Sequence, residues 1–456
     1  MLNRKHFHKI LPPVLAVVTV LTLAACENNA LPNNQPSPQE ETSQASPIQL
    51  PQNTVQQEQG YMEQQEQASI QNHERAIEDV GVIIAAGQFG SFTVLPDGSL
   101  WGWGLWGDIE WYDGMETPTP NITPQKIMDD VKYVAAAGWS DSTAMILKVD
   151  GSLWALGSNP CGQFGDGSTT SRDNPVKVMD DIIDVSVGGF HTMVIKADGS
   201  LWTFGGNWHG QLGDSTTIDR YTPVKIMDDV IAVSAGSSHS MAITSDGVLW
   251  GWGHNGTGRL GYEPTANELN PIHPSPIKIL DNVAQVSAGH DHTLAIKTNN
   301  TLWAWGNNFW GSLGVGPPVI PPENPFHLTP SPSPIPMQVL FDVAAISAGN
   351  RYSMAITSDG VLWGWGFNEG FAKLGLGDAV REQNLPAVVS SPMRVMDDAV
   401  SVSAWDSHTL AVRNDGSVWA WGNNTWGQIG DGGPYGFPED GTIASRNTPT
   451  LICLPY

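Results

Sequence analysis

Apolar and polar residues alternate along most of the chain in short runs, which is the pattern of half-buried β-strands. One such run is His239–Ile243, and another is Leu249–Gly253. Between them lies Asp246-Gly247, and an Asp-Gly pair between two alternating runs is a strong signal for a β-hairpin. The pattern therefore predicts short antiparallel strands joined by tight turns.

One phrase divides the chain after residue 79 into repeats. It is Asp-Gly-Ser-Leu-Trp or a close variant, and its seven copies begin at Asp97, Asp150, Asp198, Asp246, Asn299, Asp359 and Asp415, with a mean spacing of 53 residues. Each copy offers four strands, from a first stretch such as Val233–Gly236 to a fourth strand such as Thr222–Ile226, which belongs to the preceding copy. Four strands in each of seven repeats predict an all-β fold, a seven-bladed β-propeller of four-stranded antiparallel blades.

The lengths of the connections predict how the ring closes. The turn after a fourth strand is short, as at Met227–Asp229, whereas the loop that contains Gly210–Gly213 is long. A short connection suits a hairpin and a long one suits a crossing between blades. We therefore expect each blade to combine one repeat's fourth strand with the next repeat's first three. The last strand, Thr450–Leu454, is then expected to join the blade that begins at Val80 and to hide its edge.

The repeat resembles that of the regulator of chromosome condensation family. The resemblance is carried by Ala-Gly-x-x-His, Asp-Gly-x-Leu-Trp-x-Trp-Gly-x-Asn and Gly-Gln-Leu-Gly, and it covers residues 80–456. Repeat 6 departs at Ala372–Gly375 and repeat 1 at Gly107–Ile109, so their loops are expected to differ. The resemblance implies a propeller that binds proteins. Its eukaryotic role is guanine-nucleotide exchange on a small GTPase with chromatin attachment, and a secreted β-lactamase inhibitor is an extracellular binder of this family.

Charge and composition remove several other classes of protein. Acids number 46 and bases 21, a formal charge of −25, and no basic stripe is present to bind nucleic acid. Charged residues make up 15% of the chain, too few for a coiled coil. Three cysteines are too few for a disulfide-stapled scaffold.

The N-terminus predicts export and a lipid anchor. Bases without acids precede an apolar run, Ile10–Leu23, that is short for a membrane-spanning helix. The run ends in Leu-Ala-Ala-Cys, which resembles the bacterial lipobox. We expect residues 1–25 to be a lipoprotein signal peptide and Cys26 to carry the lipid, the alternative being an ordinary signal peptide that contains a cysteine. Residues 26–79, rich in Gln, Asn, Pro and Ser, are expected to form a disordered tether. The protein is then attached to the cell membrane and faces outside the cytoplasm.

Strand direction sorts the connections onto two faces. The Gly-x-x-His tips and the long loops share one face, here called the upper face, while the Asp-Gly hairpins and Met-Asp-Asp turns share the lower face. The lower face collects sixteen aspartates. Because Asp is a preferred turn residue, turn chemistry and solubility explain them better than attraction of cations or basic partners.

The upper face varies from repeat to repeat, as a binding surface requires. Our candidate partner-binding residues are Phe89, Trp139, Phe190, Asp291, Arg351, Trp405 and Asp406. Aromatic and charged side chains at such tips are typical of interface hot spots. The alternative is that they plug the central channel. The tryptophans that recur in every repeat are expected to pack between blades, and His191, His239, His292 and His408 are expected to make structural hydrogen bonds rather than to bind metal.

The function that these features favour is binding. No nucleophile elbow, His-Glu-x-x-His or phosphate loop is present, so we expect no enzyme, no cofactor and no metal. The leading hypothesis is a monomeric, surface-anchored propeller whose upper face binds a protein or peptidic partner, with inhibition of a secreted enzyme as one version. The alternatives are the exchange-factor role implied by the resemblance, and a propeller hydrolase or lyase acting on cell-surface polymer.

Overall fold

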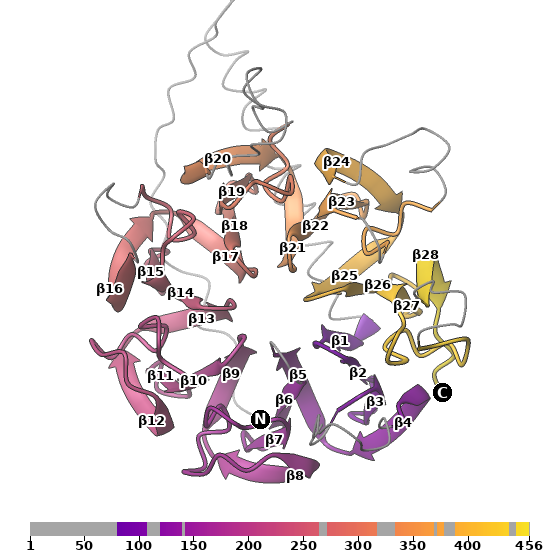
Figure 1. Ribbon diagram of the computed structural model, residues 1–456, viewed down its shortest axis with the longest axis horizontal. Helices are drawn as coiled ribbons and strands as arrows, with labels where there is room; N and C mark the ends of the chain where they lie inside the picture. Colours follow the sequence, from indigo (N-terminus) through magenta and orange to yellow (C-terminus); the bar gives the residue numbers. More distant parts are fainter. Residues whose placement is uncertain are drawn as a thin grey trace, which may run out of the picture. The chain divides into compact units, whose positions relative to one another are not determined.

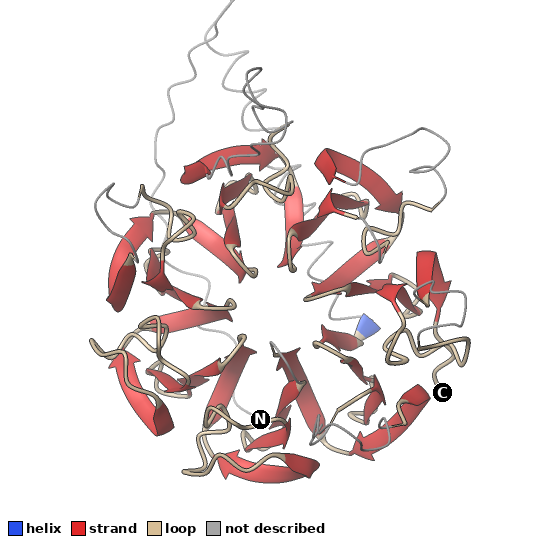
Figure 2. Cartoon of the chain, in the orientation of Figure 1, coloured by secondary structure: helices blue, strands red, loops and turns tan. Residues whose placement is uncertain are grey.

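The strands of the repeats form a ring of blades, as predicted. The computed structural model describes residues 80–106, 119–138, 142–263, 271–316, 333–368, 372–377, 388–436 and 444–455. These residues contain 28 strands in seven four-stranded antiparallel sheets around a central shaft (Figures 1 and 2). The predicted signal peptide, Cys26, the tether (26–79) and Trp139 lie outside the described residues.

The four strands of each blade run outward from the shaft in chain order (Figure 1). The first strands, which line the shaft, are β1 (Ile83–Ala86), β5 (Val131–Ala137), β9 (Ile182–Val187), β13 (Val230–Ala235), β17 (Val283–Ala288), β21 (Val343–Ala348) and β25 (Ala399–Ala404). The second strands are β2 (Gly90–Val94), β6 (Thr143–Lys148), β10 (His191–Lys196), β14 (His239–Thr244), β18 (His292–Lys297), β22 (Tyr352–Thr357) and β26 (His408–Arg413). The third strands are β3 (Leu100–Gly104), β7 (Leu153–Gly157), β11 (Leu201–Gly205), β15 (Leu249–His254), β19 (Leu302–Gly306), β23 (Leu362–Phe367) and β27 (Val418–Asn423). The outermost strands are β4 (Asn121–Met128), β8 (Arg172–Met179), β12 (Arg220–Met227), β16 (Ile272–Leu280), β20 (Ser333–Leu340), β24 (Val388–Met396) and β28 (Ser445–Leu451).

The expected composition of the blades is wrong. Strand β28 pairs with β27 in the seventh blade, with Leu451 opposite Trp419, and does not join the first blade. A two-residue turn is enough to reach the next blade because the new first strand begins against the preceding hairpin, where Val230 N–H donates to Gly199 O at 3.0 Å. Removing residues from Thr450 onward therefore shortens the outer strand of blade 7, not of blade 1.

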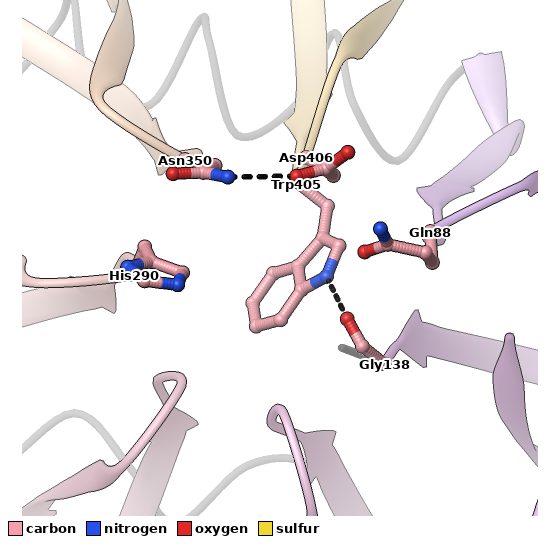
Figure 3. A pocket seen from close by; sticks show the side chains of 6 residues that line it. All are labelled: Gln88, Gly138, His290, Asn350, Trp405 and Asp406. Atoms are coloured by element: carbon pink, nitrogen blue, oxygen red, sulfur yellow. Dashed lines mark hydrogen bonds between the residues drawn. The ribbon is translucent and has the colours of Figure 1, made fainter. Parts of the chain in front are cut away.

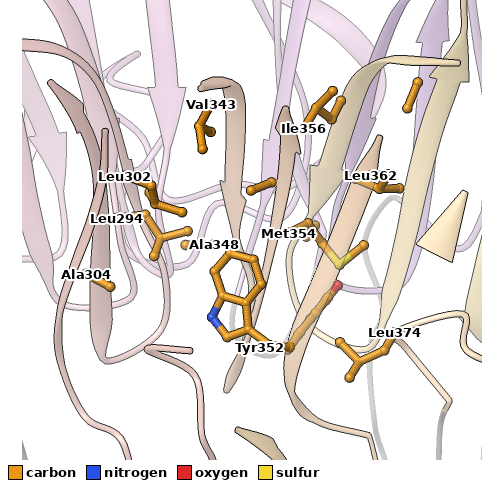
Figure 4. Close-up of a cluster of buried hydrophobic side chains, with 14 of the residues drawn as sticks. Leu294, Leu302, Ala304, Val343, Ala348, Tyr352, Met354, Ile356, Leu362 and Leu374 are labelled. Atoms are coloured by element: carbon orange, nitrogen blue, oxygen red, sulfur yellow. The ribbon is translucent and has the colours of Figure 1, made fainter. Parts of the chain in front are cut away.

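The hydrophobic core lies between neighbouring blades. The second strands are almost wholly buried, and each core cluster joins side chains of adjacent sheets. Figure 4 shows one cluster, in which Leu294 and Leu302 of blade 5 face Tyr352 and Met354 of blade 6. The recurring tryptophans belong to these clusters; Trp202, for example, packs against the cluster of blade 2. The prediction that they pack between blades is confirmed.

Six of the long loops dock on the next blade, each through one backbone carbonyl, and we call this contact the interblade clasp. Most of the long loop of blade 1 lies outside the described residues. Gln211 O accepts the Trp252 Nε1–H at 2.9 Å and the Ser240 hydroxyl at 2.6 Å. The same pair of bonds is made to the carbonyl oxygens of Arg259, Ser312, Lys373 and Gln428. Between blades 2 and 3 Phe204 stands at the tryptophan position, and Gln163 O accepts the Thr192 hydroxyl at 2.8 Å.

The tip histidines add a third bond to the clasp. His191 Nε2 lies 2.7 Å from Ser240 Oγ, whose hydrogen already points at Gln211 O, so the imidazole must be the donor. Its Nδ1 is buried and has no hydrogen-bond partner within the described part of the chain. His239, His292 and His408 repeat the arrangement at 3.0, 2.8 and 2.7 Å from Thr293, Ser353 and Ser91. The expected structural role of these histidines is confirmed.

A second set of interblade bonds follows the shaft. A serine on the first strand of one blade accepts a backbone N–H from the first strand of the next at 2.9 Å, and the serines are Ser186, Ser234, Ser287, Ser347 and Ser403. Ala85 and Ala136 occupy this position in blades 1 and 2 and have no hydroxyl to offer. The two junctions that flank blade 2 therefore lack this bond.

The ring closes between blades 7 and 1 by the same contacts that join the other blades. Gln428 O accepts Trp103 Nε1–H at 2.9 Å, and Ser403 Oγ accepts Ala86 N–H. One hydrophobic cluster joins Val82 and Ile84 of blade 1 to strands β26 and β27 and to Ile452, beyond β28. Closure therefore rests on side-chain packing and the clasp, with no strand shared between the two blades.

The lower-face aspartates are turn residues. The second residue of six interblade turns has a positive φ between 54° and 64°, and it is Asp130, Asp181, Asp229, Asn282, Asp342 or Asp398. Asp and Asn tolerate this backbone region better than other residues with a side chain. The first aspartate often pairs with a lysine of the preceding strand, as Asp129 does with Lys126 at 2.7 Å. These contacts favour the turn interpretation of the acidic face.

The clasp histidines should make the fold sensitive to acid. Burial lowers the pKa of His191 to about 3 and of His292 and His408 to about 4, from an ordinary 6.5. The unfolded chain therefore binds more protons than the folded chain below pH 6.5, so stability is present above that pH and is lost as the pH falls toward 4. Asp184, whose pKa burial raises to about 6, acts in the opposite direction but is a single group.

We predict that the melting temperature falls steadily between pH 6.5 and pH 4. The double variant His191→Gln, His408→Gln keeps a donor at each position and removes two of the titrating groups, so its melting temperature should fall less steeply over this range. Calorimetry at a series of pH values measures both slopes. Identical slopes in the two proteins would show that these imidazoles are not the cause.

Candidate functional site

Two aromatic candidates on the upper face, Phe89 and Phe190, are paired with tryptophans of the long loops. The Phe89 ring lies 5.8 Å from Trp426 of blade 7, and the Phe190 ring lies 5.1 Å from Trp208 of its own blade. Trp208 is 48% exposed. Tips and loops therefore build aromatic pairs on this face, and the loop tryptophans extend the set that the sequence predicted.

Arg351 is the exposed candidate at the tip of blade 6. Its guanidinium lies 5.0 Å from the centre of the Trp310 ring, and Trp310 packs edge-on against Phe367 at 4.5 Å. Its φ is +67°, a region that side chains other than Asn, Asp and Gly seldom adopt. The surrounding structure holds this strained backbone so that the arginine lies on the aromatic surface.

Trp405 crosses the upper mouth of the shaft. Its indole N–H donates to Gly138 O at 2.8 Å, so a side chain of blade 7 reaches past blade 1 to blade 2 (Figure 3). In blade 4 the position of Trp405 is held by Gly236, and a Cβ at Gly236 would lie 2.4 Å from the His239 ring. Trp405 occupies the place predicted for a channel plug, and it also forms part of the surface that a partner would meet.

Above Trp405 lies a cavity of about 270 Å³, which we call the mouth pocket. Gln88, Gly138, His290, Asn350, Trp405 and Asp406 line it (Figure 3). The Asn350 amide donates to the Asp406 carboxylate at 2.7 Å. Among the predicted residues, the structure thus brings Trp405 and Asp406 together in one site.

Asp291 lies outside the lining of this pocket. One oxygen of its carboxylate accepts the Asn307 side-chain amide at 2.6 Å, and the other is buried without a hydrogen-bond partner among the described residues. Because repeats 1 to 3 are consecutive and the ring brings repeat 7 beside repeat 1, the sequence predicts that six of the candidates form one crescent on the upper rim: Phe89, Trp139, Phe190, Arg351, Trp405 and Asp406. The crescent stays a prediction, because Trp139 lies outside the described residues.

Two buried cations support the tips, and the sequence analysis did not include them. Lys373 donates to Asn350 O at 2.6 Å and lies 4.8 Å from the Tyr352 ring, and burial lowers its pKa to about 8. Arg259 donates to Ser238 Oγ at 3.0 Å and to His290 O at 3.2 Å. Both stand at the Gln position of the Gly-Gln-Leu-Gly motif. A basic residue in place of that glutamine could have identified both side chains from the sequence.

The shaft below Trp405 holds a second cavity, of about 260 Å³. Its walls are the first strands, and they include Tyr133, Asp184 and the five serines that bond neighbouring blades along the shaft. Burial raises the pKa of Asp184 to about 6 and that of the Tyr133 phenol above its ordinary value. Asp184 was not among the candidates, because the aspartates that the repeat pattern singles out lie in turns and Asp184 lies on strand β9.

Neither a metal centre nor a membrane span stands out in the described part of the chain. No three His, Cys, Asp or Glu side chains there are close enough to hold a metal ion together. No helix among those residues has the length and apolar character to cross a bilayer.

Comparison with known proteins agrees with this architecture. The model of the RCC1-like domain matches residues 152–455, about two thirds of the chain. The ultraviolet-B receptor UVR8 of Arabidopsis thaliana is 33% identical over 176 residues, which are 38% of this chain and 34% of the receptor. The human E3 ubiquitin-protein ligase HERC2 is 32% identical over 159 residues, which are 34% of this chain and 3% of the ligase. The matched segment is thus a third or less of these relatives.

Solved structures share the fold at low identity. Prp20p of Saccharomyces cerevisiae superposes with a TM-score of 0.61 at 18% identity, over 83% of this chain and 89% of its own. Yeast RCC1 (Prp20) in its complex with Kap60 superposes with a TM-score of 0.60, also at 18% identity, over 73% of this chain and 78% of its own. The repeats, the ring of seven blades and the matching family model lead to one conclusion: this chain belongs to the RCC1-like domain family.

Proposed function

We propose that this chain is an extracytoplasmic, lipid-anchored binding module whose upper face captures a protein partner. The observation that carries the proposal is the contrast between the framework and the tips. Five junctions repeat one set of clasp bonds, whereas the tips above them carry different side chains in every blade. A surface that varies over an invariant frame suits recognition of a partner.

The Arg351–Trp310 cluster supplies the anchor that a hot spot needs. The arginine is exposed, its backbone is held in a strained conformation, and its guanidinium is already stacked. Pre-organised arginine and aromatic side chains dominate the binding energy of many interfaces. Among related propellers, yeast RCC1 binds Kap60, and Prp20p has binding properties toward Gsp1p and histones, which supports protein recognition as a use of this fold.

The predicted lipid on Cys26 and the predicted tether would hold the propeller at the membrane, outside the cytoplasm. In that location, one function of partner binding would be to inhibit a secreted enzyme. Guanine-nucleotide exchange is disfavoured, because an exported protein does not meet cytosolic GTPases. The large excess of acidic residues also disfavours chromatin attachment.

Arg351→Ala should weaken capture of the partner from culture supernatant strongly, by about 2–4 kcal/mol. Arg394→Ala is the matched control, since Arg394 is also an exposed arginine but lies on the outer strand β24, paired with Asp397. Quantitative pull-down measures capture, and thermal unfolding checks that both variants keep the wild-type stability. Equal capture by Arg351→Ala and the wild type would show that the Arg351–Trp310 cluster is not part of the binding site.

Trp139→Ala extends the same measurement to the tip of blade 2. If the predicted crescent is the site, capture falls and the melting temperature stays near that of the wild type. A loss of capture that only follows a loss of stability would assign Trp139 a structural role.

Cys26→Ala tests the anchor independently of the face. The variant should be released from the membrane or remain unprocessed, because the thiol that accepts the lipid is gone. Fractionation of cells that express each form gives the answer. A variant that stays with the membrane in the same amount and at the same mature size as the wild type contradicts the lipobox prediction.

A further inference from the structure

The mouth pocket presents more hydrogen-bond acceptors than the protein satisfies. The Asn350 amide nitrogen donates to Asp406, so its oxygen, Oδ1, faces elsewhere, and that oxygen is buried with no donor among the residues that the structure describes. A buried acceptor without a donor is unfavourable, so a ligand that supplies one gains affinity. The carboxylate of Asp406 and the side-chain amide of Gln88 line the same cavity. The pocket is therefore suited to a ligand that donates hydrogen bonds.

The indole of Trp405 adds an aromatic wall. Its bond to Gly138 O holds the ring across the shaft, between His290 on one side and Gln88 on the other (Figure 3). The face of a tryptophan ring attracts cations. Burial lowers the pKa of His290 to about 4, so this imidazole is neutral at physiological pH and does not repel a positive charge.

The protein's own nearby cations are committed elsewhere. Lys373 Nζ donates to the backbone oxygens of Asn350 and Asp406, at 2.6 and 3.3 Å, and lies against two aromatic rings. Arg351 is stacked on Trp310. Neither side chain lines the mouth pocket. The Asp406 carboxylate and the Asn350 oxygen thus stay available to an incoming donor.

The cavity is sized for one side chain rather than for a whole ligand. Its volume is about 270 Å³. Pockets for drug-sized ligands measure roughly 300–1,000 Å³. A formal charge of −25 on the chain also favours a basic partner through long-range attraction.

We propose that the mouth pocket binds the cationic end of one lysine or arginine side chain of the captured partner. The charged group donates to Asp406 and to Asn350 Oδ1, while the aliphatic stem and the charge lie against Trp405. The proposal rests on the proposed function and names the feature of the partner that the centre of the upper face recognises. It places the basic side chain at the axis of the ring, with the Arg351–Trp310 cluster to one side.

The test uses small mimics of the two side chains on the full-length protein. The ¹⁵N-indole resonance of Trp405, identified by its absence in Trp405→Phe, is followed while n-butylammonium or n-propylguanidinium is added. A saturable shift with a cation, and none with n-butanol, supports the pocket, and the tighter cation tells lysine from arginine. The absence of a saturable shift with either cation, or an equal shift with n-butanol, overturns the proposal.

Matched variants locate the charge that matters. Asp406→Asn keeps the shape and removes the charge, so it should weaken binding of the mimic about tenfold or more. Asp415→Asn is the control: it lies in the lower hairpin of the same blade, and repeat 5 has Asn299 at that position. Equal weakening by the two variants, or none by Asp406→Asn, contradicts the role of the pocket.

Competition separates this inference from the proposed function. An excess of the better mimic should reduce capture of the partner by the wild type and have a smaller effect on Asp406→Asn. If Arg351→Ala weakens capture but neither the mimic nor Asp406→Asn does, the upper face is the binding surface and the mouth pocket is not used. If no partner is captured through the upper face at all, the proposed function fails, and binding of the mimic alone does not rescue it.

Discussion

The docking of each long loop on the next blade is the interaction on which the ring depends. A single carbonyl oxygen accepts an indole N–H and a hydroxyl from the neighbouring sheet, and all three groups are buried. Such groups would be costly to bury unpaired, so the bond aligns neighbouring blades as well as holding them. The close fit also explains the loop glycines: a Cβ at Gly213 would lie 2.8 Å from Trp252 Nε1, and one at Gly314 would lie 2.8 Å from Trp365 Nε1.

A frame held this way leaves the upper tips free to differ. In five blades the last residue of the tip motif takes part in the contact with the next blade: it is a histidine in four of them, and in blade 6 it is Tyr352, whose hydroxyl donates to His408 O at 2.7 Å. Blade 2 departs most from this frame, since Ala136 stands where blades 3 to 7 have a shaft serine and Leu156 replaces the inner tryptophan. Blade 1 lacks only the serine, and blade 3 lacks only the tryptophan. The tips that bear the candidate residues thus rest on junctions of unequal strength, and Trp405 links blades 7 and 2 across their upper ends.

The sequence predicted the blades, the two faces and the structural role of the repeated residues, because those features follow from periodicity. It failed on the composition of the blades because connection length is a poor guide to where a loop goes: the long loop docks on its neighbour and returns to its own sheet. It also missed Lys373 as a buried group, since the oxygens that hold its ammonium come from the tips of blades 6 and 7. The hydrogen bond from Trp405 to Gly138 could not be predicted for the same reason, because no local sequence pattern indicates a contact between residues 267 positions apart.

Hydrogen exchange of the tryptophan indole N–H groups tests most directly whether the clasp closes the ring. The protein is labelled with ¹⁵N at the indoles, and the exchange of each N–H is followed under native conditions. The account predicts that Trp103, at the junction of blades 7 and 1, is protected as strongly as Trp252 and Trp305 at junctions inside the ring. The half-buried Trp101, bonded to Ser99 of its own hairpin, should exchange much faster. Exchange of Trp103 at the rate of Trp101 would mean that the ring opens at this junction, and would contradict closure by the clasp.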